Sequence, residues 1–98
     1  MFTGTLAFDV LLGDVHSRKA KRGVVRPILA ELTRRYGVSA AEVGHLDLHR
    51  RGLLAVSVVA ADAGRCRDVL DGCERLVAAR PEIELLSAHR RLMGEEDG

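Results

Sequence analysis

Apolar and polar residues alternate in the first segment of the chain. From Leu6 to Leu12 every second residue of "LAFDVLL" is large and apolar, while Ala7 and Asp9 stand between them. A period of two is typical of a strand with one buried face. We therefore predict a strand over residues 2–12, which Gly13 ends.

After residue 17 the alternation gives way to a repeat of three and four residues. The apolar positions of this repeat are Ala20, Val24, Val25, Ile28, Leu29, Leu32 and Tyr36. The spacing predicts an amphipathic helix over 17–36, with Ser17 as N-cap and Gly37 just after its last turn. Pro27 lacks the N–H that would bond to the carbonyl of Gly23. We therefore expect the helix to be kinked or irregular before Pro27, or regular only from about Arg26.

A second helical repeat follows Asp62, which we expect to act as its N-cap. The apolar stripe of this helix consists of Cys66, Val69, Leu70, Cys73, Leu76 and Val77. A spacing of seven residues puts the two cysteines ~10.5 Å apart along a helix axis, too far for a disulfide. We expect both to be reduced, unpaired core residues of a cytoplasmic protein, without a metal or redox role.

Three further strands complete the pattern. We predict them over 38–48, over 53–60 and from Ile83 to about Arg91, after Pro81. Between the second and third strands, "DLHRRG" is typical of a polar hairpin tip, with Gly52 available for a positive φ. The order β-α-β-β-α-β predicts an α+β protein, a ferredoxin-like sandwich whose four-stranded antiparallel sheet has two helices on one face. Residues 1–93 form one domain in this interpretation, and 94–98 an acidic flexible tail.

Charge is unevenly distributed over the 98 residues, although the net charge is only +1. Residues 16–36 contain seven Lys and Arg against Glu31 alone, whereas the rest of the chain carries eight bases and thirteen acids. The apolar N-terminus has no basic region before it and contains Asp9, so we expect neither a signal peptide nor a membrane helix. The composition fits a globular protein, and no membrane partner is expected.

The predicted topology collects bases at one end of the molecule. The start of the first helix, the tip between the second and third strands, and the end of the second helix share that end. Its candidate anion-binding residues are His16, Arg18, Lys19, Lys21, Arg22, His49, Arg50, Arg51 and Arg80, with the acids Asp14, Asp47 and Glu82 nearby. Bases are disfavoured at a helix N-terminus, whereas phosphate is favoured there, so we predict a site for an anion such as the RNA backbone. The alternative is an ordinary solvated face.

Lys21 falls on the apolar side of the predicted helix, where an unpaired ammonium is costly. We expect the first turn either to overhang the sheet or to be a basic loop. Both arrangements expose the amine at the rim, where it can meet a ligand.

Two further motifs stand in the chain: H-S-x-K-x-K-R after the first strand, and A-E-V-x-H-x-D in the second strand. Their residues are His16, Ser17, Lys19, Lys21, Arg22, Ala41, Glu42, Val43, His45 and Asp47. In this combination the chain resembles the YlxP-like family of small bacterial proteins, domain of unknown function 503. The chain departs at Arg18, where the family usually has Leu, and at Ala20, where it has an acid. The resemblance implies a ferredoxin-like fold and a gene setting near translation-initiation and ribosome-maturation factors; it implies no substrate and no catalytic residue.

Enzymatic chemistry has little support in the sequence. His45, Asp47 and His49 share one face of an extended strand, which would suit a metal, but three successive same-face residues close poorly on one ion. No nucleophile turn, P-loop or dinucleotide motif is present, so no cofactor is expected. An enzyme that uses this His/Asp strand stays open as one alternative.

The sheet face without helices is the other candidate surface. Its predicted outward residues contain no aromatic side chain, which disfavours base stacking of the RRM type. Leu11, Leu53, Val59 and Leu86, with Ala88, make it apolar, and we expect it to be covered in a homo-oligomer or a partner complex. Three hypotheses therefore remain: an RNA- or ribosome-associated binding module, a homo-oligomeric interaction module, and an enzyme.

Overall fold

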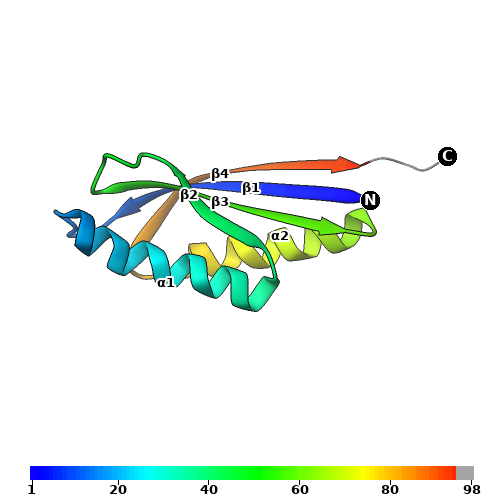
Figure 1. Ribbon diagram of the computed structural model, residues 1–98, viewed down its shortest axis with the longest axis horizontal. Helices are drawn as coiled ribbons and strands as arrows, with labels where there is room; N and C mark the ends of the chain where they lie inside the picture. Colours follow the sequence, from blue (N-terminus) through cyan, green and yellow to red (C-terminus); the bar gives the residue numbers. More distant parts are fainter. Residues whose placement is uncertain (95–98) are drawn as a thin grey trace.

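Six elements follow one another in the predicted order β-α-β-β-α-β (Figure 1). The computed structural model describes residues 1–94, so most of the predicted acidic tail lies outside the described residues. The elements are β1 (Phe2–Leu12), α1 (Arg18–Tyr36), β2 (Ser39–Gly44), β3 (Arg51–Ala60), α2 (Ala63–Ala78) and β4 (Ile83–Gly94). The strands are antiparallel in the order β2-β3-β1-β4, with both helices on one face. This confirms the predicted α+β ferredoxin-like sandwich.

The core lies between the helices and the sheet. Its residues form a single buried cluster in which Phe8 and Leu54 from the central strands pack with the stripes of both helices. Cys66 and Cys73 are fully buried and unpaired, as predicted. Burial raises the pKa of Cys73 to about 11, so its thiol stays protonated at neutral pH. No helix within residues 1–94 is both long enough and apolar enough to span a bilayer.

Helix α1 begins and ends at the residues that the sequence indicates. Ser17 Oγ accepts a hydrogen bond from the N–H of Ala20 at 3.1 Å, and Gly37 adopts a left-handed conformation with φ 64°. The helix is continuous from Arg18 to Tyr36 with Pro27 inside it, so the expected late start near Arg26 is wrong. The cap on the first turn allows the helix to begin ahead of the proline. A bend of the axis at Pro27 stays a prediction.

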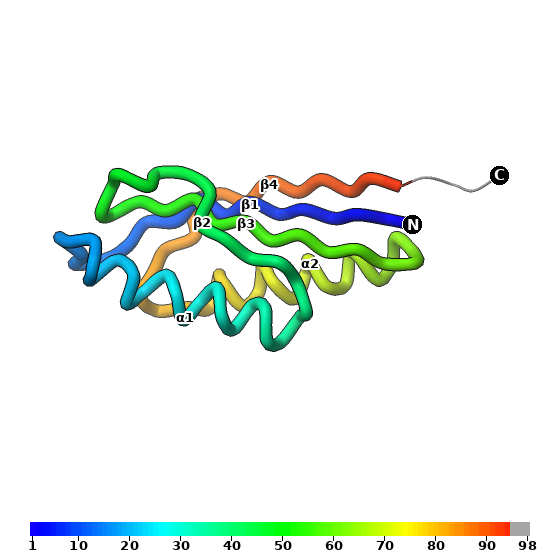
Figure 2. The backbone as a smooth tube through the Cα atoms, in the orientation of Figure 1, coloured from blue at the N-terminus to red at the C-terminus, as the bar shows by residue number. Residues whose placement is uncertain are grey.

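The connection between β2 and β3 differs most from the prediction. Strand β2 ends at Gly44 after a register shift, so residues 45–48, predicted as strand, belong to the connecting segment 45–50. The tube in Figure 2 shows this segment, which we call the β2–β3 loop, rising from the sheet on the side away from the helices. The positive φ falls on His45, at 56°, and not on Gly52. Gly52 instead lies buried in β3 opposite Val10.

A bulge in β4 changes which residues face the helices. The register with β1 shifts between Asp9 and Val10, which leaves Leu86 as an extra residue opposite neither of them. One extra residue reverses the alternation beyond it. Ala88 therefore packs against the core, and its predicted place on the open face is wrong. Leu86 remains 45% exposed.

Candidate functional site

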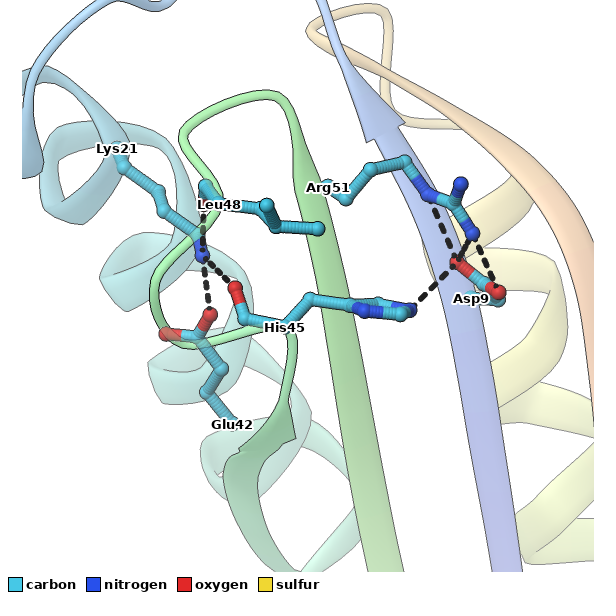
Figure 3. Close-up of polar contacts among 6 residues, drawn as sticks. All are labelled: Asp9, Lys21, Glu42, His45, Leu48 and Arg51. Atoms are coloured by element: carbon cyan, nitrogen blue, oxygen red, sulfur yellow. Dashed lines mark hydrogen bonds and ion pairs between the residues drawn. The ribbon is translucent and has the colours of Figure 1, made fainter.

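Lys21 is the one buried charged residue within 1–94, with 5% of its surface exposed. Its ammonium nitrogen lies 2.6 Å from the carbonyl oxygen of Leu48, 2.9 Å from that of His45 and 2.7 Å from a carboxylate oxygen of Glu42 (Figure 3). The expectation of an amine exposed at the rim is therefore wrong. Three oxygen atoms replace the water that an exposed ammonium would bind, which makes its burial tolerable.

These contacts join α1 to the β2–β3 loop. Lys21 comes from the first turn of α1, Glu42 from the helix-facing side of β2, and the two carbonyls from the loop. The carbonyls take the directed hydrogen bonds, whereas the contact with Glu42 is an ion pair without hydrogen-bond angles. The N–H of Leu48 also donates to the carbonyl of His45 at 3.0 Å. One ammonium therefore fixes both ends of the turn 45–48.

The same loop is attached to the opposite, open face of the sheet. Asp9 accepts hydrogen bonds from Arg51, whose Nη2 lies 2.7 Å from each carboxylate oxygen. The imidazole of His45 crosses β3 and places Nε2 3.6 Å from Oδ1 of Asp9 (Figure 3). The hydrogen bonds from Arg51 hold the pKa of Asp9 below its usual value; burial opposes this, and the charges of Arg51 and His45 add to it.

His45 therefore acts in two directions. Its carbonyl binds Lys21 on the helix side, and its side chain faces Asp9 on the open side. A left-handed backbone is uncommon for a residue other than glycine and persists where neighbours hold it in place. We call the set Lys21, Glu42, His45, Asp9 and Arg51 the loop anchor.

Sequence reasoning missed the loop anchor as a unit. Lys21 belongs to the first motif and Glu42 and His45 to the second, so the contacts join the two halves of the pattern. The available signal was that each motif carries a charged residue at a core-facing position, namely Lys21 and Glu42.

The metal set that the sequence analysis considered and disfavoured does not form. Because β2 ends at Gly44, His45, Asp47 and His49 do not share one face of a strand. His45 is drawn toward Asp9, while Asp47 lies 3.8 Å from Arg18. Across the described part of the chain, no group of three or more His, Cys, Asp or Glu side chains is placed to hold a metal ion.

Several predicted anion ligands are engaged within the protein. His16 Nε2 lies 2.6 Å from Asp14, and both side chains are exposed. Arg50 donates from Nε to the carbonyl of Gly13 at 2.9 Å, which ties the hairpin tip to the end of β1. The carboxylates Glu42 and Asp9 offset the charges of Lys21 and Arg51, whereas Arg50 keeps its charge beside the carbonyl of Gly13.

Arg80 does not join the basic end. Its Nη1 lies 2.9 Å from Glu31 and its Nε 3.2 Å from Glu82, so two carboxylates neutralise it. Glu31 is thirteen residues after Arg18 on the same helix, which is ~20 Å along the axis. The end of α2 thus meets the second half of α1, and the predicted placement of Arg80 beside the helix start is wrong.

The remaining bases lie along the outer side of α1. They are exposed, and we call them the α1 basic face: Arg18, Lys19, Arg22, Arg26 and Arg34. Among contacts within 1–94, only Arg18 has an ion pair, 3.8 Å long between two exposed side chains. Arg26 and Arg34 were counted in the basic segment but not predicted as site residues. The spacing of four residues from Arg18 to Arg22 to Arg26 was the signal for them.

A shallow pocket adjoins the start of this face. It has a volume of about 220 Å³ and is lined by Arg18, Arg22, Lys21, Glu42, Leu46 and Asp47. Charges of both signs meet there, from Arg18, Arg22 and Lys21 on one side and Glu42 and Asp47 on the other. The α1 basic face, in contrast, is convex and follows the helix for ~24 Å.

Comparison with known proteins agrees with the resemblance in the sequence. The chain is 26% identical over 76 residues to the "Uncharacterized protein YlxP" of Bacillus subtilis (strain 168), which covers 78% of this chain and 83% of the relative. Residues 3–90 match the family model described as "Protein of unknown function (DUF503)". Because that match spans most of the chain, the protein belongs to the DUF503 family.

Proposed function

We propose that the protein is a non-catalytic binding module that holds the phosphate backbone of RNA, on the ribosome or on free structured RNA, along the α1 basic face. The observation that carries this proposal is a row of exposed bases on one helix, of which Lys19, Arg22, Arg26 and Arg34 have no ion pair within the described residues. Phosphates are bound by such rows of Lys and Arg through counterion release. The site is thus a revision of the predicted basic end, moved along the helix.

A phosphate backbone fits this face better than a membrane does. The exposed large apolar residues of the protein lie on strands, at the N-terminus and in the β2–β3 loop, and none lies on α1. A helix that binds a bilayer surface needs apolar side chains to insert beside its bases. The α1 basic face offers only charge and small side chains.

The contacts would be to phosphate, so little base specificity is expected. Among residues 1–94 the open face has no Phe, Tyr or Trp side chain for stacking, because Phe8 is in the core and Phe2 and Tyr36 pack against it. We expect duplex RNA of unrelated sequences to bind with similar affinity.

The test is binding of a labelled RNA hairpin, followed by fluorescence anisotropy at several salt concentrations. If about four phosphates are neutralised, affinity falls roughly 100-fold between ~50 and ~200 mM salt. The variant Arg22→Glu/Arg26→Glu/Arg34→Glu should lose binding at ~50 mM salt while keeping its fold, because all three side chains are exposed and unpaired.

Helix α2 supplies a matched control. Arg65, Arg67 and Arg75 are also exposed, and none has an ion pair within 1–94. Changing these three to Glu alters the net charge by the same amount at a different place. The proposal requires this control to keep most of the affinity. Equal loss in both variants, or no RNA binding by the parent protein at ~50 mM salt, would overturn it. Co-sedimentation with ribosomal subunits then distinguishes the ribosome from free RNA.

A further inference from the structure

We propose that the open face of the sheet, opposite the helices, packs against the same face of a second copy in a two-fold dimer. The outward residues of the three long strands have a defined register. Among them, Asp9, Leu11, Arg51, Leu53 and Glu84 lie at the loop end of the face, and Thr5, Ala7, Ala55, Ser57, His89 and Arg91 lie toward the other end. This inference does not depend on the RNA proposal, which concerns the other side of the molecule.

The two halves of the face differ in height. At the loop end, the register places Leu11 and Leu53 on the outward side of neighbouring strands. The β2–β3 loop rises above the sheet at the same end (Figure 1). In the other half, the central strands carry Ala55 and Ser57 opposite Ala7 and Thr5. The surface of the open face is therefore stepped: it is raised at the loop end and lowered over the central strands of the other half.

A two-fold axis that runs across the strands at the level of Phe8 makes this step complementary to itself. The register then places Leu53 over Ala55 of the second copy and Leu11 over its Thr5. Each raised half covers a lowered half. Sheets that pack face to face keep such an arrangement at a mean separation of ~10 Å and an angle of about 30°.

Charge follows the same symmetry. Glu84 lies opposite Leu11 and Arg91 opposite Thr5, so the two charged residues stand on one strand at equal distances from that axis. Both are exposed, and neither has an ion pair among the described residues. The two-fold operation brings Glu84 of each copy over Arg91 of the other. Two ion pairs thus form across the dimer, and the length of both side chains tolerates the crossing of the sheets.

The available area is close to what a stable dimer needs. Strands of ten to twelve residues, spaced ~4.8 Å apart beside the shorter β2, give a face of roughly 600 Å² in projection. A standard interface buries about 800 Å² of accessible surface on each partner. A second copy fills the whole face, including Val59 and Leu86, which are 65% and 45% exposed in one chain.

The experiment exploits the reciprocity of the two ion pairs. The mass of the parent protein is measured by light scattering after size exclusion at about 100 µM, a concentration at which a micromolar dimer is filled. We expect twice the mass of one chain. The single variants Glu84→Arg and Arg91→Glu each place two like-charged pairs across the interface and should weaken association at least ~100-fold. Circular dichroism checks that both remain folded.

Mixing the two single variants is the decisive measurement. In a mixed dimer, Arg at position 84 of one copy meets Glu at 91 of the other, and the natural Arg91 meets the natural Glu84. The mixture should therefore dimerise although neither variant does alone, and the double variant Glu84→Arg/Arg91→Glu should dimerise by itself. A monomeric parent overturns the proposal, as does a parent dimer that survives both single variants, since its interface then lies elsewhere.

Discussion

Helices α1 and α2 lie side by side on the same face of the sheet, yet they carry different outer surfaces. The exposed side of α2 mixes three bases with three acids, namely Arg65, Arg67, Asp68, Asp71, Glu74 and Arg75. Asp71 and Glu74 are paired with Arg90 of β4, at 2.8 and 3.7 Å. The outer side of α1 has five bases, and Glu31, the one acid of the helix, is bound to Arg35 and Arg80. Two of the three acids of α2, Asp71 and Glu74, are paired within the fold, whereas the bases of α1 are mostly left over.

The inner sides differ as well. Helix α2 buries an apolar stripe alone, while α1 buries Lys21 among its apolar residues. Through Lys21, α1 also fixes the β2–β3 loop, to which α2 has no equivalent contact within 1–94. Charge on a helix can therefore be structural or free, and neighbouring residues such as Lys21 and Arg22 can fall in opposite classes. The difference lies in burial, which the net charge does not reveal.

The largest expected effect comes from breaking the buried contact of α1. Lys21→Met leaves Glu42 without its partner and removes the ammonium from the carbonyls of His45 and Leu48, so we expect a loss of about 3–5 kcal/mol in the free energy of unfolding. Urea denaturation measures it. Arg22→Met is the control and should change stability by no more than about 0.5 kcal/mol, because Arg22 is exposed. Equal effects of the two changes would remove the distinction between structural and free bases.

A second variant separates lost charge from lost loop structure. Lys21→Met/Glu42→Leu removes both charges and should recover at least about 1 kcal/mol relative to Lys21→Met alone. Amide hydrogen exchange at Leu48 should be faster in both variants than in the parent protein, because the Lys21 ammonium that holds the two loop carbonyls is missing in each. Slow exchange at Leu48 in Lys21→Met would show that the loop stands without this anchor.

The comparison also explains which parts of the molecule the sequence could predict. The period of β1, the cap at Ser17 and the left-handed Gly37 are local features, and each lies where the pattern indicates. The partners of Lys21 are 24 and 27 residues away in the chain. No local pattern encodes such a contact, so the same residue was interpreted as a free ligand at the rim.

The same reason accounts for the errors at β2 and β4. Strand β2 ends at Gly44, where its register with β3 shifts and the loop bound by Lys21 begins, and the bulge at Leu86 shifts a register that alternation alone extends unchanged. For the site, the excess of bases on α1 was visible in the composition. Which of those bases are free was not, because Lys21 meets Glu42 and Arg18 meets Asp47 only through the fold.

The helices also differ in the space around their glycines, and this difference gives the next largest expected effect. A Cβ added at Gly72 of α2 would overlap the ring of Tyr36 from α1, whereas a Cβ at Gly23 of α1 would meet nothing within 4 Å. We expect Gly72→Ala to destabilise by about 1–3 kcal/mol through overpacking. Gly23→Ala should stabilise by about 0.5–1 kcal/mol, because alanine favours a helix interior. Thermal unfolding of both variants measures the two signs, and stabilisation by both would mean that the helices do not pack this closely at Tyr36.

The smallest effect concerns the other attachment of the loop, on the side away from α1. The pKa of Asp9 is lowered by the hydrogen bonds from Arg51, so the pair stabilises the fold above the unfolded pKa of Asp9, near 3.8, and this stabilisation is lost as the pH falls through the lower folded value. Because the pair is partly exposed, Asp9→Asn should cost only about 0.5–1 kcal/mol at pH 7. The difference between parent and variant should shrink as the pH is lowered below about 4. Urea denaturation at pH 7 and pH 3 provides the measurement, with Asp68→Asn on the outer side of α2 as the control, since Asp68 has no ion pair within the described residues. If the cost of Asp9→Asn were as large as that of Lys21→Met, the sheet rather than α1 would be the main support of the loop. Fixing the loop would then no longer distinguish α1 from α2.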